Sequence, residues 1–599
     1  MKKMKKHIQY LLGTLLIGMF LNSCNLDEFP QAAASSVAVF GSASGLELYT
    51  NSFYEMLPTP YDGVFLIDDN SDLVARQGVE TRLVPNALSP TTSGGWETPS
   101  SATEFMDGWR GLRNINYFIE NCEKSTVAEK EHYLGLAHFF RAYFYYAKVR
   151  RFGDVPWIVS TIEVDDNGTL YGPRDDRFFV MEQVLKDLNY AIANITTTTD
   201  ASCTRITKNV VRAFKTRVCL YEASYRKYHT QYGKQSSANT WFEEVVNTAN
   251  EITGFSLRQG TNAYRQLFLQ KAPYTDETIL AVRLDAALQT YSSRNRKTIS
   301  PTYSNRPSLN RRFINMYLNI DGTSFTSNPD YKTTPFIEEV KNRDLRLSQT
   351  IRSGNYMRTE NGAPVVAPPN LDQSFTGYQI IKGCYDERFP FDDESRNENA
   401  HLIFRYAEIL LNKAEALAEL GRMTDSDWTS TIGALRARAG ITGTTLTQKP
   451  TVADPYLIEV YKNKFTDPVM LEVLRERAVE MIMEGLRPDD LMRWRLGDLL
   501  AEAPMNGMYV PALGDYDLNG DGKIDVCFYQ GSRPSSTASV FIDVSNSTTV
   551  GTRHLTEGTS GELVWKPGTR EWMDKKYLYP IPEVSRIKNP DLGQNPGWE

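Results

Sequence analysis

The stretch from residue 128 to 158, AEKEHYLGLAHFFRAYFYYAKVRRFGDVPWI, decides the fold class. Its pattern predicts a long helix that is apolar nearly all round, which is typical of a helix buried on several sides. Gly153 and Pro156 predict where this helix ends, because glycine and proline interrupt helices. A helix buried on several sides needs other helices around it, so this stretch predicts a mainly helical protein.

Two further helices are expected directly after it. Residues 178–195 and 206–228 each carry one apolar stripe at helical spacing, and Thr207 is a suitable N-cap for the second helix. The stripes consist of Met181, Val184, Leu185, Leu188, Ile192 and Ile195, and of Val210, Phe214, Val218, Tyr221 and Tyr225. Consecutive helices of this length favour an array of stacked helical hairpins.

The helical pattern is interrupted in the middle of the chain and returns in its last third. Its middle is rich in Ser, Thr, Asn, Pro and Tyr, with a strand expected at 277–286 and a long ordered loop at 287–313. Helical periodicity returns near residue 397, and Gly421 is a suitable C-terminal stop. We therefore expect a helical N-terminal part (about 35–255), a loop-rich middle (about 256–397), and a helical C-terminal part with a tail (about 398–599).

The first residues predict an exported protein. A cationic start precedes the apolar run 8–21, which is too short for a comfortable membrane span and suits a signal peptide. Leu21-Asn22-Ser23-Cys24 resembles a bacterial lipobox, so we expect residues 1–23 to be removed and Cys24 to carry acyl chains. The alternative is an ordinary signal peptide with a chance cysteine. Asp27 and Glu28 resemble a short surface-export signal, with a plain spacer as the alternative.

Composition excludes several classes of protein. The net charge of −7 and the absence of a basic run argue against nucleic-acid binding. The cysteines after Cys24 are scattered without a Cys-x-x-Cys pair, which argues against a zinc or redox site. No His-Glu-x-x-His, Gly-x-Ser-x-Gly or Walker A pattern occurs, so we expect no enzyme and no catalytic cofactor.

Five ordered segments resemble the SusD/RagB family of outer-membrane nutrient-binding lipoproteins. They are HFFRAYFYYAKVRRFGDVPWI (138–158), FRYAEILLNKAEALAELG (404–421), ALRARAGI (434–441), RERAVEMIMEGLRPDDLMRW (475–494) and YLYPIPEVSRIKNPDLGQNPGW (577–598). The resemblance spans essentially the whole mature chain. It implies a single SusD-like domain over 24–599, mostly α, with a tetratricopeptide-like helix-pair scaffold, long loops and a few short strands.

The resemblance also implies a function. SusD-like proteins are lipid-anchored at the outer membrane, face the cell surface, and capture an oligosaccharide or a peptide. They pass it to a SusC-like TonB-dependent barrel without chemical change. We therefore expect a glycan ligand, a barrel partner and a membrane reached through the lipid anchor. The alternatives are an all-α surface glycoside hydrolase and a peptide-binding surface lipoprotein.

Two loops carry candidate glycan-binding residues. In the loop 65–101, Trp96 is a candidate stacking platform, and Asp68, Asp69 and Arg76 are candidates for bonding hydroxyls. The loop 287–313 alternates planar and cationic side chains, which suits sugar stacking and bidentate bonds. Its candidates are Tyr291, Arg294, Arg296, Tyr303 and Arg306. For Trp96 the alternative is a buried tryptophan that pins its loop. For the loop 287–313 the alternatives are a docking edge for the barrel partner and a solvated loop face.

A candidate calcium loop lies at 515–525, DYDLNGDGKID. Asp517, Asn519, Asp521 and Asp525 supply oxygen ligands at alternate positions, and Lys523 offers its carbonyl. Position twelve is Phe528, so the usual bidentate acid is missing. A structural calcium ion is one hypothesis, and an Asp-Gly turn in a hairpin is the other.

Three glutamates share one helix face in the segment 470–500. Paired carboxylates at a suitable separation can hydrolyse glycosides. Glu476, Glu480 and Glu484 are interleaved with Arg475, Arg477, Arg487 and Arg493. This surrounding of arginines favours a salt-bridged structural helix over a catalytic pair.

Overall fold

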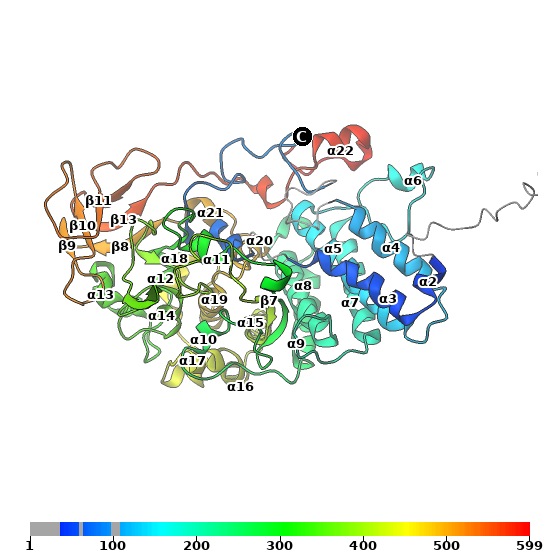
Figure 1. The fold of residues 1–599 in the computed structure, drawn as a ribbon. Coiled ribbons are helices and arrows are strands. Elements are labelled where there is room, and N and C mark those ends of the chain that lie inside the picture. The colour runs from blue at the N-terminus through cyan, green and yellow to red at the C-terminus, as the bar shows by residue number, and fades with distance from the viewer. Residues whose placement is uncertain (1–35, 59–63, 97–107) are drawn as a thin grey trace, which may run out of the picture.

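The computed structural model describes residues 36–58, 64–96 and 108–599, which form a mainly helical protein with short strands (Figure 1). The N-terminal helices are α2 (Ser36–Phe40), α3 (Ala43–Asn51), α4 (Arg110–Cys122), α5 (Lys130–Phe152), α6 (Asn167–Leu170), α7 (Arg177–Asn194), α8 (Lys208–Tyr228) and α9 (Ala238–Asn250). Helix α5 packs on α7, and α8 packs on α9. The predicted helix pairs are therefore confirmed.

The ends of these helices follow local chemistry. Helix α5 ends at Gly153, whose φ of +73° suits glycine, and a Cβ there would lie 2.7 Å from a methyl carbon of Leu578. The hydroxyl of Thr207 accepts a hydrogen bond from the Val210 N–H at 3.3 Å and so caps α8. Both ends were predicted from the sequence.

The middle and C-terminal parts add shorter helices. In the middle lie α10 (Ala263–Gln266), α11 (Arg294–Thr298), α12 (Arg311–Ile314), α13 (Phe336–Glu339) and α14 (Arg346–Thr350). The C-terminal part has α15 (Tyr406–Glu419), α16 (Asp425–Trp428), α17 (Ala434–Arg438), α18 (Pro455–Val460), α19 (Pro468–Met481), α20 (Arg487–Arg493), α21 (Leu499–Glu502) and α22 (Glu583–Lys588). Helix α15 packs on both α9 and α19, so it joins the two helical parts.

The strands form small sheets of two or three strands, and β1, β2, β3 and β6 are largely buried. One sheet has the order β1 (Val74–Ala75), β3 (Ser308–Leu309), β6 (Tyr378–Gln379), and another pairs β2 (Thr278–Val282) with β7 (His401–Arg405). A further pair is β4 (Met357–Glu360) with β5 (Ala363–Val366). Another sheet has the order β9 (Gly514–Tyr516), β10 (Val526–Tyr529), β11 (Val540–Asp543). The last has the order β8 (Asn506–Val510), β13 (Gly561–Trp565), β12 (Arg553–Leu555). All pairs are antiparallel except β10 with β11. The strand predicted at 277–286 is β2, and the predicted loop 287–313 also contains α11 and β3.

Two large apolar cores hold these elements. The first lies among α3, α4, α5, α7, α8, α9 and α15, and the second among α18 to α21 and the strands near them. The cysteines of the described part, from Cys122 to Cys527, are all buried and free. Among the described helices, none is long and apolar enough to cross a membrane.

A buried ionic cluster around Glu480 joins elements that are far apart in sequence. This carboxylate on α19 contacts Arg405 at 2.5 Å, Arg346 at 2.8 Å and Arg438. Glu277 pairs in turn with Arg405 and Arg438, both at 3.1 Å. Burial raises the pKa of Glu480, but the three arginines outweigh it and hold that pKa well below the ordinary 4.5. The predicted salt-bridged role of Glu476 and Glu480 is thus confirmed, whereas Glu484 lies beyond the end of α19 and not on its face.

Glu480→Gln keeps the shape of the side chain and removes its charge. We expect the free energy of unfolding to fall by about 3–5 kcal/mol, because three buried arginines lose a shared partner. Urea unfolding followed by circular dichroism measures this loss. Glu338→Gln is the matched control, since Glu338 forms an exposed pair with Lys341 and should contribute under about 1 kcal/mol. A loss no larger than that of the control would contradict the structural role.

The same ion cluster predicts a pH dependence. A carboxylate whose pKa is lowered by folding adds stability above its unfolded pKa, and that stability is lost as pH falls through the folded pKa. The stability gap between the natural protein and Glu480→Gln should therefore be constant above about pH 5.5 and narrow below about pH 4.5. Urea midpoints of both proteins from pH 7 to pH 3 measure the gap. A stability gap that widens as the pH falls would contradict this prediction.

Candidate functional site

The structure brings parts of the two predicted loops together. Strand β1 pairs with β3 so that Ala75 lies opposite Ser308. This register places Arg76 and Arg306, each one or two positions beyond its strand, at the same edge. We call the surface around Arg296, Tyr303 and Arg306 the loop face. Arg76 borders it, but its guanidinium donates to Asn70 and lines a small cavity with Asp69.

Tyr303 is the exposed aromatic of the loop face. It is 48% exposed, and the guanidinium of Arg296 lies 4.1 Å from its ring centre. One face of the ring is thus covered by a cation, which fixes the ring while much of it remains open to solvent. This arrangement suits stacking against the C–H face of a sugar.

Trp96 does not form an exposed platform, so that prediction is wrong. Its side chain is only 3% exposed and packs edge-on against Trp109 and Phe152, with ring centres 5.4 and 5.1 Å apart. Lys148 donates hydrogen bonds to the carbonyls of Gly95 and Trp96, which ties this segment to α5. The tryptophan anchors its loop in the first core, as the alternative predicted.

Asp68 and Asp69 are also inside the protein, so the prediction that they bond sugar hydroxyls is wrong. Asp68 accepts hydrogen bonds from the backbone N–H groups of Glu484, Gly485 and Arg487 at 3.0 to 3.3 Å. Burial raises the pKa of Asp69 to about 8, although the charge of Arg76 opposes the rise. Asp69 lines a cavity of about 20 Å³, which is room for about one water.

Tyr291 and Arg294 lie apart from the β1–β3 pair, beside the segment around Asn397, to which Ser292 is bridged. Tyr291 is half-buried and donates a hydrogen bond to the carbonyl of Ala286 at 3.3 Å. Arg294 is buried and donates one to the carbonyl of Lys382 at 3.1 Å.

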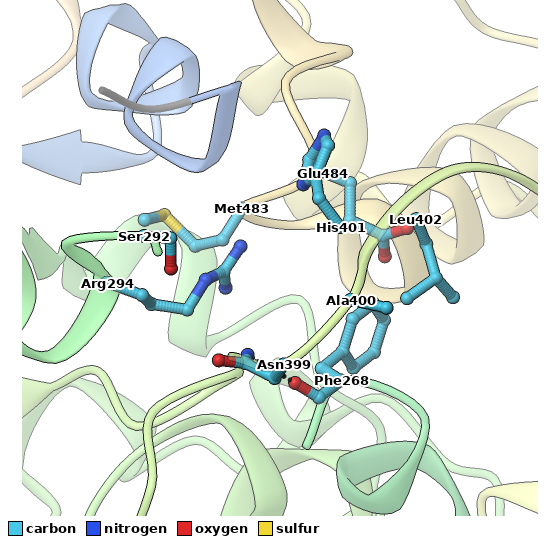
Figure 2. A pocket seen from close by; sticks show the side chains of 9 residues that line it. All are labelled: Phe268, Ser292, Arg294, Asn399, Ala400, His401, Leu402, Met483 and Glu484. Atoms are coloured by element: carbon cyan, nitrogen blue, oxygen red, sulfur yellow. Dashed lines mark hydrogen bonds between the residues drawn. The ribbon is translucent and has the colours of Figure 1, made fainter. Parts of the chain in front are cut away.

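Figure 2 shows Arg294 extending into a small cavity below Met483, with His401 and Glu484 on the other side. This cavity also measures about 20 Å³. Burial lowers the pKa of His401 to about 3, so its imidazole is neutral at ordinary pH. The prediction that Arg294 bonds a sugar is wrong, because no pyranose fits in this space.

The predicted calcium loop is a hairpin connection. It joins β9 to β10, which pair antiparallel, so the loop lies in a hairpin. The Asp517 carboxylate accepts hydrogen bonds from the N–H groups of Asn519, Gly520 and Gly522, and Asp525 accepts one from Leu518 at 2.7 Å. Lys523 is exposed and pairs with Asp521 at 3.8 Å.

In the described part of the chain, no three His, Cys, Asp or Glu side chains are arranged to hold a metal ion. Calcium at Asp517, Asn519, Asp521, Lys523 and Asp525 stays a prediction. Cys24, Asp27 and Glu28 lie outside the described residues.

One aromatic surface was missed by sequence reasoning. Two adjoining pockets of about 550 and 620 Å³ share Tyr331, Tyr456 and Glu459, and the first is also lined by Tyr509. We call the two together the tyrosine groove. Its tyrosines come from the segment before α13, from α18 and from β8, so no local pattern could have linked them.

Comparisons with known proteins identify the family. A family model described as the SusD family matches residues 276–598. A second model, described as starch-binding associating with outer membrane, matches residues 91–220. A SusD-like protein of Formosa agariphila is 24% identical over 534 residues, which cover 85% of this chain and 95% of that protein.

Solved structures agree on the fold. A SusD-like protein from Bacteroides fragilis, 21% identical, superposes with a TM-score of 0.66 over 94% of this chain and 98% of its own. A SusD-like carbohydrate-binding protein from the same organism, 19% identical, gives 0.64 over 92% and 99%. Together with the family match over residues 276–598, more than half of the chain, these likenesses show that the protein belongs to the SusD family.

Proposed function

We propose that this protein is a lipid-anchored, cell-surface glycan-binding protein. It captures an oligosaccharide and passes it to a SusC-like TonB-dependent transporter in the outer membrane. Family membership supports the proposal, and so does the match of residues 91–220 to a model described as starch-binding associating with outer membrane. The lipobox-like Cys24 supplies the tether in this proposal.

The observation that carries the proposal is the loop face. Residues more than two hundred positions apart meet there through the β1–β3 pair. Tyr303 offers a ring for stacking, backed by Arg296, and the half-buried Arg306 offers a planar, multiply donating group for sugar hydroxyls. The binding is non-covalent and of modest strength, because the ligand must leave for the transporter.

A glycoside hydrolase is the less favoured function. Glu476 and Glu480 are buried and bind arginine side chains. Glu484 lines a pocket of about 470 Å³, but its carboxylate is paired with Lys382 and Arg405, so the three glutamates form no free carboxylate pair. Peptide binding at the loop face remains the second candidate, since the same arginines suit acidic peptide groups.

Replacing Tyr303 with Ala tests the glycan proposal. We expect binding to weaken about tenfold, which corresponds to about 1.4 kcal/mol, because the stacking surface is lost. Affinity electrophoresis of residues 25–599 against plant, microbial and host polysaccharides measures the retardation. Tyr171→Ala is the matched control, since Tyr171 is equally exposed at 49% but belongs to the end of α6. No retardation by any polysaccharide would argue for a peptide ligand instead.

A structural calcium ion is proposed for the loop 517–525. If it binds, calcium should raise the thermal unfolding temperature of the protein by several degrees over that in EDTA, through mass action on the folded state. Asp517→Asn should abolish the difference, because it removes a charge from the first ligand position. Equal unfolding temperatures with calcium and with EDTA would mean that this loop is a hairpin turn that binds no calcium.

A further inference from the structure

The tyrosine groove lies at the end of the molecule that is opposite to the first helices. Its walls come from the segments around α12, α18, α21, β8 and β13, on the left of Figure 1, whereas α2 to α5 lie on the right. Among the described residues, none of the loop-face residues lines either pocket of the groove. The groove and the loop face are therefore separate surfaces.

The rings of the groove are held by contacts with one another and with arginine residues that line the same pocket. Tyr331 and Tyr456 meet edge to face, with ring centres 6.2 Å apart and an angle of 80°. The Tyr456 hydroxyl donates a hydrogen bond to the carbonyl of Arg312 at 2.7 Å. The guanidinium of Arg311 lies 5.8 Å from the ring centre of Tyr509. All three rings are half-buried, so each is held by the protein and still presents part of its surface.

Polar groups that suit hydroxyls lie beside these rings. The Asn506 side chain donates to Glu562 at 2.6 Å, and Arg311 donates to the same carboxylate at 3.2 Å. Lys332 and Thr333 are exposed next to Tyr331. Sugar binding needs such a mixture of apolar rings and oriented donors and acceptors.

The charges of the groove nearly cancel. Its carboxylates are Asp454, Glu459, Glu472, Glu502, Glu557 and Glu562, and its cations are Arg311, Arg312, Lys332, Arg436 and Lys462. Several of these groups already pair with one another or with neighbours, such as Arg311 with Glu562 and Arg436 with Glu472. A surface of this kind offers no net attraction to an acidic sugar, so it favours a neutral one.

The size of the groove favours a chain over a single sugar. Each pocket falls within the range of about 300–1,000 Å³ that is typical of small-ligand sites. The pockets share Tyr331 and Tyr456, so a ligand can pass from one to the other along the same rings.

We infer that the tyrosine groove is a second glycan-binding site, which takes a neutral oligosaccharide segment of several sugar units. The inference rests on the proposed function for the class of ligand. A polysaccharide held at both the loop face and the groove gains avidity, because the second contact forms within one complex.

The test pairs two substitutions, Tyr331→Ala with Tyr509→Ala, in residues 25–599. Both side chains are half-buried at the surface, and thermal unfolding checks that the double variant is folded. The probes are amylopectin, galactomannan and arabinoxylan as neutral polysaccharides, and polygalacturonate as an acidic one. We expect the double variant to lose at least tenfold in affinity for whichever neutral probe the natural protein binds.

Two controls separate stacking from general damage. Tyr331→Phe with Tyr509→Phe keeps the rings and should stay within twofold of the natural protein, and Tyr171→Ala should be unchanged. If the natural protein binds a neutral probe and the double alanine variant binds it within twofold as tightly, the groove is not a glycan-binding site. The proposed function would still stand in that case. Retardation by polygalacturonate alone would overturn the neutral ligand. Retardation by none of the probes, nor by the wider polysaccharide panel, would overturn both proposals.

Discussion

The loop-rich middle and the C-terminal helices meet at the buried carboxylate of Glu480. It lies on α19 and binds three guanidiniums that come from α14, from the end of β7 and from the end of α17. A buried ion cluster adds little net stability compared with well-packed apolar side chains, but each of its charged groups must meet a specific partner. The cluster therefore fixes how the loop-rich middle joins the C-terminal helices.

The loop face depends on the same region through a second contact. The turn after α19 presents the backbone N–H groups of Glu484, Gly485 and Arg487, and Asp68 accepts from all three. Asp68 precedes β1 by a few residues, so this contact positions the strand that pairs with β3. Asp68, which the sequence predicted to contact a ligand, instead holds the segment that leads into the loop face.

The sequence was a good guide to local structure and a poor guide to exposure. Periodicity and caps predicted α5, α7, α8 and their ends, because these depend on residues within a few turns. Burial of Trp96 depends on Trp109 and Phe152, and a Gly-Gly-Trp segment looks the same whether its ring faces water or a core. The tyrosines of the groove come from three distant segments, so only the assembled fold brings them together.

The C-terminal tail also covers the end of α5. The Asn595 side chain donates a hydrogen bond to the carbonyl of Phe152 at 2.8 Å, across 443 positions of sequence. The Tyr579 N–H donates one to the carbonyl of Arg151. The side chain of Leu578 covers Gly153. The first core therefore includes Ile581 and Leu592 of the tail, which are synthesised long after α5. A chain that stops early keeps this end of α5 open, and such an unclosed surface invites proteolysis. This end of the first core thus stays uncovered until residues 578–595 have been synthesised.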